Sequence, residues 1–398
     1  MKFIAKHRNL IIFILLTLLW SVFMGMMKFY LRSYLKEVRT LQEIAWYASL
    51  GWTLAYLVGG AFAYAFTKKK IIIWSAFICI ICLIVWSRLH YTPFLLFTFL
   101  LSIIGFMYSL RLTVKSIILS TEIVTSWLSE TLVNGLTNIS ILIWFLWWSY
   151  LWFIAYAKQG TWWFMRILCL LLVCVLLSLF FTYDKLFTGK PFMPTLKKSM
   201  PNILEVTERY FRFLVPIGIL WAVWMAMWQK MLQIWIDDFN KMPVSSMLII
   251  VVFFTWGIAG NLISAFIKTN KKLITLIFII IAGRSVILFP HFLHMHDNYM
   301  FLNMYSFAIG VFCGIAINIL EGRYFYRIGD DHKKEYGAAA YGLICSILMF
   351  FIMIISDLLT TGFGDKFAYF FCGIVILINI FFMKELDKTE HKNLELRS

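Results

Sequence analysis

The feature that most constrains this chain is a series of long apolar segments separated by short polar stretches. Each segment is about 20 residues long, the length that an α-helix needs to cross the ~30 Å hydrocarbon core of a bilayer. Runs such as 71–86 and 273–281 show no alternation of polar and apolar residues, which excludes the strands of a transmembrane barrel. Because lipid offers the backbone no hydrogen bonds, the remaining solution is a bundle of transmembrane helices.

Composition agrees with this solution. Hydrophobic residues make up 62% of the 398 residues and charged residues only 14%, so a soluble domain could not cover its surface with polar groups. The formal net charge of +16 resides mostly in loops beside the apolar segments. We therefore attribute the charge to membrane orientation and contact with anionic headgroups, and we expect no nucleic-acid partner.

We predict twelve transmembrane helices in two groups of six. The polar stretch 184–210 divides them, and we expect it to be a cytoplasmic linker between an N-terminal bundle (1–183) and a C-terminal bundle with a short cytoplasmic tail (211–398). The fold class is therefore an all-α integral membrane protein. The predicted helices are 10–31, 44–66, 71–88, 93–112, 131–156, 161–183, 211–235, 244–267, 273–292, 300–320, 337–360 and 366–384.

Lysine and arginine indicate the orientation. They gather in the loops after the even-numbered helices, including 68–70, Arg111 with Lys115, and the central linker. The first outside loop, 32–39, is an exception. By the positive-inside rule these even-numbered loops are cytoplasmic, and so are both termini.

This layout resembles the major facilitator superfamily. That family carries a Gly-x-x-x-Asp-x-x-Gly-Arg-type motif between its second and third helices. The matching stretch here keeps Gly60 and a basic end at 68–70, but Tyr64 stands where the family has the aspartate. The sequence thus leaves open whether the interhelical charge contact of the motif forms. The resemblance implies a secondary transporter that works by alternating access and needs no cofactor.

Within the superfamily, three patches are most similar to bacterial lysophospholipid transporters. One begins with Lys115-Ser-Ile-Ile-Leu and continues through Glu122 to Asn134-Gly-Leu. The resemblance implies a monomeric carrier of lysophospholipid in the cell inner membrane, with a separate acyltransferase as a candidate partner. Acids that this family carries in its first and eleventh helices are absent, and Lys28 and Met349 lie in those regions.

Charged groups inside membrane helices usually face a cavity or a partner. Lys28 and Lys230 are candidates to bind an anionic substrate group such as a phosphate. The alternative is that both lysines extend to the headgroups. Trp224 and Trp228 belong to a tryptophan stripe on the seventh helix. The stripe either lines a cavity suited to an acyl chain or packs against lipid.

Asn134 and Asn138 are four residues apart and therefore share one helix face. They are candidates to bind a headgroup or to tie two helices together. Charged residues in or beside the predicted helices suggest gating or ion coupling. The candidates are Lys115, Glu122, Glu130 and Asp357.

Among the acids, Asp357 is the candidate for coupling. For Glu130 and Glu321 we expect gate salt bridges to Arg111 or Arg323.

No pattern typical of an enzyme is found: the sequence has no GxSxG, phosphate-binding loop or HExxH motif. We therefore expect neither catalysis nor a bound metal. Two alternatives to lysophospholipid transport stay open at this point. The first is export of a drug-like or siderophore-like amphiphile, and the second is a membrane scaffold that derives from a transporter but does not transport.

Overall fold

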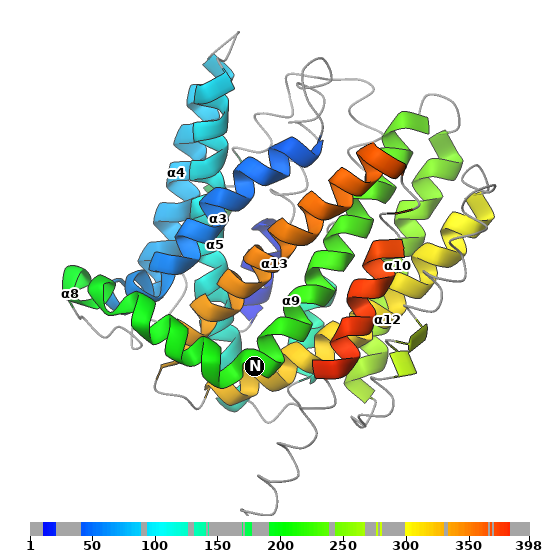
Figure 1. Ribbon diagram of the computed structural model, residues 1–398. Helices are drawn as coiled ribbons and strands as arrows, with labels where there is room; N and C mark the ends of the chain where they lie inside the picture. Colours follow the sequence, from blue (N-terminus) through cyan, green and yellow to red (C-terminus); the bar gives the residue numbers. More distant parts are fainter. Residues whose placement is uncertain are drawn as a thin grey trace, which may run out of the picture. The chain divides into compact units, whose positions relative to one another are not determined.

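The computed structural model describes a large part of the chain and shows it to be helical, with no strand among the described residues (Figure 1). This confirms the all-α prediction. The described residues are 11–20, 41–88, 94–125, 131–140, 142, 169, 172–176, 191–238, 243–266, 276–277, 279–280, 299–329, 333–364, 367 and 370–382.

The long helices follow the predicted apolar segments closely. Three stretches within the described residues are long and apolar enough to cross a membrane: Phe99–Val124, Ser199–Ala226 and Lys334–Phe363. Shorter helical segments cover 11–20, 131–140 and 370–382. The labelled helices are α3 (Leu41–Ala65), α4 (Lys68–Arg88), α5 (Phe94–Thr125), α8 (Phe192–Lys197), α9 (Ser199–Asp238), α10 (Pro243–Phe266), α12 (Tyr299–Gly329) and α13 (Lys334–Phe363).

Helix α5 differs from the prediction at its C-terminal end. We expected the fourth helix to stop at 112, but it continues to Thr125. Its hydroxyl groups lower the hydropathy without ending the helix, because they bond to carbonyls of their own helix. Ser120 and Thr121 both donate to the carbonyl of Ile117, at 2.9 Å and 2.8 Å. Arg111, which we had placed in a cytoplasmic loop, therefore lies inside a helix, and so does Lys115.

Part of the predicted linker 184–210 is helical. Helix α8 lies within it, and α9 already begins at Ser199. This first part of α9 is amphipathic, with Ile203 and Val206 buried and Leu204 exposed. A periodic pattern of this kind predicts a helix, whereas a search for continuous apolar runs overlooks it. Helix α12 likewise continues beyond the predicted end at 320.

Packing groups the chain into two compact units. The first unit consists of Met1–Trp127, Ser140–Glu208 and Phe325–Leu343. The second unit consists of Leu128–Ile139, Arg209–Tyr324 and Ile344–Ser398. Each sequence half thus contributes a segment to the unit formed mainly by the other half. These units group residues by contact, so the predicted bundle boundaries at 183 and 211 stay a prediction.

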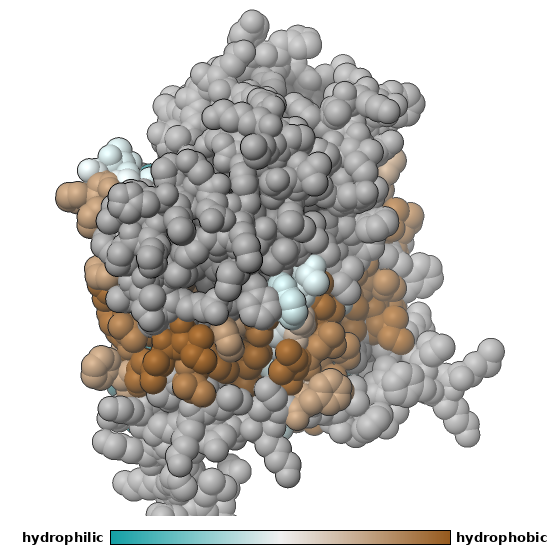
Figure 2. Space-filling view, turned by 90° about the vertical axis from the view of Figure 1, so that its right-hand side faces the viewer, coloured by the Kyte–Doolittle hydropathy of each residue, from teal (hydrophilic) through white to brown (hydrophobic). Residues whose placement is uncertain are grey.

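The described surface carries many large apolar side chains. Trp74 and Phe99 are 60% and 62% exposed, and Leu358 is 64% exposed. Figure 2 shows that the described residues on the face it draws are predominantly hydrophobic. Soluble monomers rarely expose apolar surface on this scale. A surface of this kind is what lipid contact requires.

Candidate functional site

Four charged side chains are buried among those that the structure describes: Lys68, Arg111, Glu321 and Glu335. Removing a charge from water is costly unless partners compensate for it. In a membrane protein, such residues are therefore the first candidates for function. They form three sites, two in the first unit and one in the second.

The first site surrounds Arg111 in the middle of α5. The guanidinium donates a hydrogen bond of 2.9 Å to the carbonyl of Leu16, in the helical segment 11–20. It also lies 4.5 Å from the centre of the Trp20 ring, which is a cation–π contact. Tyr108 lies near both Trp20 and Trp52, with ring centres 6.3 Å and 6.2 Å apart. Arg111 thus presents a planar fork of N–H donors, the geometry that binds carboxylate or phosphate, within an aromatic setting.

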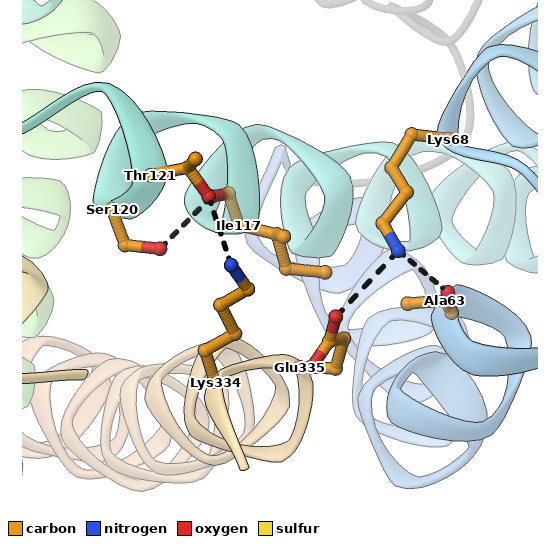
Figure 3. A network of polar contacts seen from close by, with 7 residues as sticks. All are labelled: Ala63, Lys68, Ile117, Ser120, Thr121, Lys334 and Glu335. Atoms are coloured by element: carbon orange, nitrogen blue, oxygen red, sulfur yellow. Dashed lines mark hydrogen bonds and ion pairs between the residues drawn. The ribbon is translucent and has the colours of Figure 1, made fainter. Parts of the chain in front are cut away.

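The second site joins the end of α3 and the start of α4 to the start of α13 (Figure 3). The ammonium of Lys68 donates to the carbonyl of Ala63 at 3.0 Å and lies 3.6 Å from the carboxylate of Glu335. Lys68 thus binds a carbonyl of the last turn of α3, and Glu335 lies in the first turn of α13. The ammonium is favourable to the dipole of α3 at its C-terminal end, and the carboxylate is favourable to the dipole of α13 at its N-terminal end. Burial lowers the pKa of Lys68, and the charge of Glu335 opposes this decrease.

Tyr64 takes part in the same contact. Its ring centre lies 4.9 Å from that of Tyr336. A Cβ added to Gly60 would lie 2.6 Å from the Tyr336 ring, so the glycine permits this approach. The structure thereby answers the question that the altered motif raised. An interhelical charge contact does form, through Lys68 and Glu335, and an aromatic pair includes the position of the missing aspartate. We call these five residues, Gly60, Tyr64, Lys68, Glu335 and Tyr336, the Lys68 contact.

Two neighbouring lysines bind the start of α13 to other helices of the first unit. Lys334 donates to the hydroxyl of Thr121 on α5 at 3.4 Å, as Figure 3 shows. Lys333 forms an ion pair of 2.5 Å with Glu205 on α9. The N-terminal end of α13 is therefore linked to α4, α5 and α9 by polar contacts.

The third site, in the second unit, surrounds the carboxylate of Glu321 on α12. Asn134 and Asn138 each donate an amide hydrogen bond of 3.2 Å to Oε2 of Glu321. Trp221 on α9 donates its indole N–H to Oε1 at 2.5 Å. Glu321 itself is 2% exposed. These four residues form what we call the Glu321 cluster.

Asn318 connects this cluster to α10. Its amide nitrogen donates to the carbonyl of Thr131 at 3.0 Å and to the hydroxyl of Ser264 at 2.6 Å. Its side-chain oxygen accepts from Asn134 at 2.8 Å. Because a backbone carbonyl only accepts, Thr131 fixes which end of the Asn318 amide is the nitrogen. The orientation of Asn134 follows from that of Asn318.

The sequence-predicted site residues are distributed unevenly over these sites. Asn134 and Asn138 share a helix face as expected, and both bind the same carboxylate oxygen. Trp224 is half-buried, and its ring centre lies 5.4 Å from that of Trp221.

The other predicted residues are not placed in these three sites. Lys115 and Glu122 are half-buried on α5, and Asp357 is half-buried on α13. Lys28 and Glu130 lie outside the described residues. Lys230 and Trp228 belong to α9, but their side chains are outside the described part.

Two functional candidates were assigned other roles from the sequence. We expected Arg111 in a loop, as a gate partner of Glu321, but it binds Leu16 and Trp20 within its own unit. We expected Glu321 to pair with Arg111 or Arg323, and the carboxylate accepts hydrogen bonds from two amides and an indole; the pairing with Arg323 stays a prediction. The sequence signal for the Glu321 cluster was the repeated spacing of asparagine on one helix face. For Arg111 the sequence signal was the hydroxyl-rich stretch after it, which is compatible with a helix that continues past Arg111.

Comparison with known proteins places the fold. No family model and no curated protein matches the sequence. Among solved structures, the chain is similar to the human organic anion transporter MFSD10 (TETRAN), with a TM-score of 0.71 and 9% identity over 95% of this chain and 99% of that one.

Two sugar carriers are similar as well. The proton:xylose symporter XylE, a major facilitator superfamily protein bound to 6-bromo-6-deoxy-D-glucose, gives a TM-score of 0.66 at 10% identity, over 95% of this chain and 96% of that one. The E. coli fucose:proton symporter FucP gives 0.69 at 13% identity, over 94% and 97%. At these identities the likeness concerns the fold. The chain therefore has the fold of the major facilitator superfamily transporters.

Proposed function

We propose that this protein is a secondary transporter that moves an amphipathic organic anion across the membrane by alternating access. The observation that carries the proposal is the buried guanidinium of Arg111 within this fold. Transporters of this fold bind substrate near the bilayer midplane. A buried cation near the middle of a long membrane helix is suited to bind an anionic group there.

The surroundings of Arg111 favour an amphipathic anion over a small inorganic one. Trp20, Trp52 and Tyr108 form a chain of neighbouring rings beside the guanidinium. Aromatic rings contribute a large apolar contact area together with a polar edge. An anionic headgroup at Arg111 would leave an apolar tail next to these rings. MFSD10, one of the proteins with the same fold, is an organic anion transporter, so the fold accommodates this substrate class.

Lysophospholipid is our first candidate within this class. It rests on the sequence patches around Lys115, Glu122 and Asn134. With it we propose an inner-membrane location, cytoplasmic termini, a monomeric carrier and a separate acyltransferase as partner. In the structure Asn134 binds Glu321, so its proposed role moves from the headgroup to the packing of the carrier.

The test is uptake of labelled lysophosphatidylethanolamine and of an anionic fluorescent amphiphile into proteoliposomes. We expect Arg111→Gln to reduce uptake of the transported anion by at least about tenfold, since one charge-assisted hydrogen bond contributes about 1.5–3 kcal/mol. Arg111→Lys keeps the charge but loses the fork, so its uptake should fall between the two. Arg212→Gln is the matched control because Arg212 is an exposed arginine on α9.

The uptake results distinguish the proposed functions from one another. Uptake of the anionic amphiphile without lysophosphatidylethanolamine would remove the lysophospholipid assignment and keep the anion site. Unchanged uptake of both probes by Arg111→Gln would contradict the anion site. Uptake of a cationic amphiphile instead would favour export of drug-like molecules. No uptake of any probe by well-folded protein would favour the scaffold reading.

A further inference from the structure

The helical stretch 191–204 carries side chains that neither the anion site nor the buried charged contacts use. It comprises α8 and the first turns of α9, both of which belong to the first unit. Three of its large apolar side chains are exposed: Met193 by 67%, Met200 by 46% and Leu204 by 54%. Apolar side chains are more stable against an apolar phase than against water, so these three indicate what lies next to the stretch.

Another side of the stretch packs against α3, beside which α8 lies in Figure 1. The hydroxyl of Ser199 donates to the carbonyl of Leu57 at 3.0 Å. The ring centre of Phe192 lies 4.8 Å from that of Phe62. Ser199 and Ile203 are buried and four residues apart, so they share one helix face. Protein therefore covers one face of the stretch, and the exposed apolar side chains are on another.

The exposed apolar side chains also share one face. Met193, Met200 and Leu204 are seven and four residues apart, which is close to two turns and one turn of a helix. The two helices follow one another with little change of backbone conformation, because Lys198 between them keeps right-handed helical dihedrals (φ −91°, ψ −4°). The three side chains therefore form one apolar line along the stretch.

The charges of the stretch are positive. Lys197 and Lys198 are exposed, and 191–204 contains no acid. The next residue, Glu205, forms an ion pair with Lys333. An apolar face bordered by lysines is typical of a helix that lies in the headgroup region of a bilayer. We call Met193, Lys197, Lys198, Met200 and Leu204 the α8 surface.

The backbone of this surface is held in helical form by the protein itself. Asn202 binds the carbonyl of Lys198 twice, with its backbone N–H at 3.2 Å and its side-chain amide at 2.8 Å. Pro194 and Pro201 lie in the first turns of α8 and α9, where a missing N–H removes no intrahelical bond. Because the helix is already formed, contact with lipid carries no entropy cost for ordering it.

We propose that the α8 surface binds the anionic headgroups of the adjoining bilayer leaflet, with its three apolar side chains at the boundary of the acyl chains. Lysine carries its charge on a long apolar stem, so the two ammonium groups lie at the phosphates while the stems cover apolar surface. Under the orientation proposed above, this leaflet is the cytoplasmic one. The inference does not depend on the proposed transport function, since it needs only a chain embedded in a bilayer.

The shape and composition of the surface favour lipid over a partner protein. The apolar line from Met193 to Leu204 is one residue wide and ~16 Å long at 1.5 Å rise per residue. A stable protein interface takes about 800 Å² on each partner, and lysine is depleted in such interfaces. Lysine beside an anionic leaflet is attracted to it instead, which raises the local affinity by a factor of about five per residue.

Photolabelling of the full-length protein in lipid nanodiscs tests the inference. The two probes are phosphatidylglycerol and phosphatidylcholine, each with the same diazirine near the glycerol end of an acyl chain, in a phosphatidylcholine bilayer. Mass spectrometry quantifies the labelled peptides. The internal reference is the α5 peptide around Phe99, which is exposed in a stretch, 94–110, without charged residues. After normalisation, we expect the anionic probe to label 191–204 about fivefold more than the neutral probe.

Variants separate the charge from the apolar contact. Lys197→Gln/Lys198→Gln should bring the ratio of the two probes close to one. Lys197→Arg/Lys198→Arg is the matched control because it keeps both charges, and it should keep the enrichment. Salt at about 0.5 M should lower the enrichment, because it screens exposed charges. Met200→Gln/Leu204→Gln should lower labelling of 191–204 by both probes alike.

The proposal is overturned if both probes label the wild-type stretch equally, or if Lys197→Gln/Lys198→Gln keeps the enrichment. It is also overturned if neither probe labels 191–204 while the peptide around Phe99 is labelled, since water or a partner protein then covers the surface. Labelling around Phe99 in each variant shows that the protein is embedded in the bilayer. No transported substrate is present, so the result is independent of the uptake measured with Arg111→Gln.

Discussion

The Lys68 contact and the Glu321 cluster solve one structural problem in different ways. Each binds segments that lie far apart in the sequence, and each buries a carboxylate in doing so. In the Lys68 contact, the carboxylate faces a lysine, so the two charges balance. In the Glu321 cluster, the carboxylate faces two amides and an indole, which are neutral.

This difference determines what can open each contact. In the ion pair each buried charge compensates the other, so the removal of either partner alone is costly. The carboxylate of Glu321 accepts separate hydrogen bonds from two amides and an indole, so each donor can be removed on its own. We infer that the Lys68 contact is lost as a pair, whereas the Glu321 cluster weakens donor by donor.

The largest effect should come from removing one member of the ion pair. Glu335→Gln leaves the ammonium of Lys68 buried without its counter-charge, and breaking a buried pair from one side costs about 3–5 kcal/mol. We expect a lower unfolding temperature in nanodiscs and faster amide exchange at the start of α13. Replacing both residues with methionine removes both charges and should recover most of the loss. Equal destabilisation by the single and the double variants would contradict the ion-pair account.

The next effect concerns the donor side of the Glu321 cluster. Trp221→Phe keeps an aromatic ring beside Trp224 but removes the indole N–H that binds Oε1. A hydrogen bond to a charged group contributes about 1.5–3 kcal/mol, so we expect a loss of that order at neutral pH. The loss should shrink when Glu321 is replaced by glutamine, because the acceptor is then neutral.

A double-mutant cycle of Trp221→Phe and Glu321→Gln measures this coupling by thermal unfolding at neutral pH. Additive effects in the cycle would show that the indole stabilises the protein through packing rather than through the carboxylate.

The sequence predicted the helices better than it predicted their partners. Uninterrupted apolar runs predict α3, α4 and α10 to within a few residues, because membrane helices follow hydropathy. The method fails where a helix is amphipathic or rich in hydroxyl groups, as in the early part of α9 and the end of α5. In the early part of α9, buried and exposed residues alternate along the helix. At the end of α5 most residues are buried, but hydroxyl and charged side chains interrupt the apolar run.

The candidate sites show a sharper limit. The spacing of Asn134 and Asn138 predicted a shared face, which is a local property of a helix. That Glu321 would be their acceptor depends on packing between segments almost half the chain apart, and no spacing rule reaches that far. For the same reason, the altered motif around Tyr64 could not indicate that Glu335 would be the partner of Lys68.

The smallest effect in this comparison should come from the glycines that allow each contact to close. An added Cβ at Gly60 would lie 2.6 Å from the Tyr336 ring, whereas one at Gly135 would lie 3.0 Å from the Asn318 amide and 3.3 Å from the Asn261 carbonyl. Overpacking costs about 1–3 kcal/mol, so we expect both alanine variants to lower the unfolding temperature.

The two variants should differ in the partner on which their cost depends. Gly60→Ala separates rings around the ion pair, so its cost should shrink when Lys68 and Glu335 are both methionine. Gly135→Ala displaces Asn318, which orients Asn134 toward Glu321, so its cost should shrink in the Glu321→Gln background. Gly362→Ala, with nothing within 4 Å of the added Cβ, is the matched control and should be neutral or stabilising. Costs that stay unchanged in these backgrounds would mean that the glycines act through local packing alone, because a variant that acts through a contact must cost less once that contact is removed.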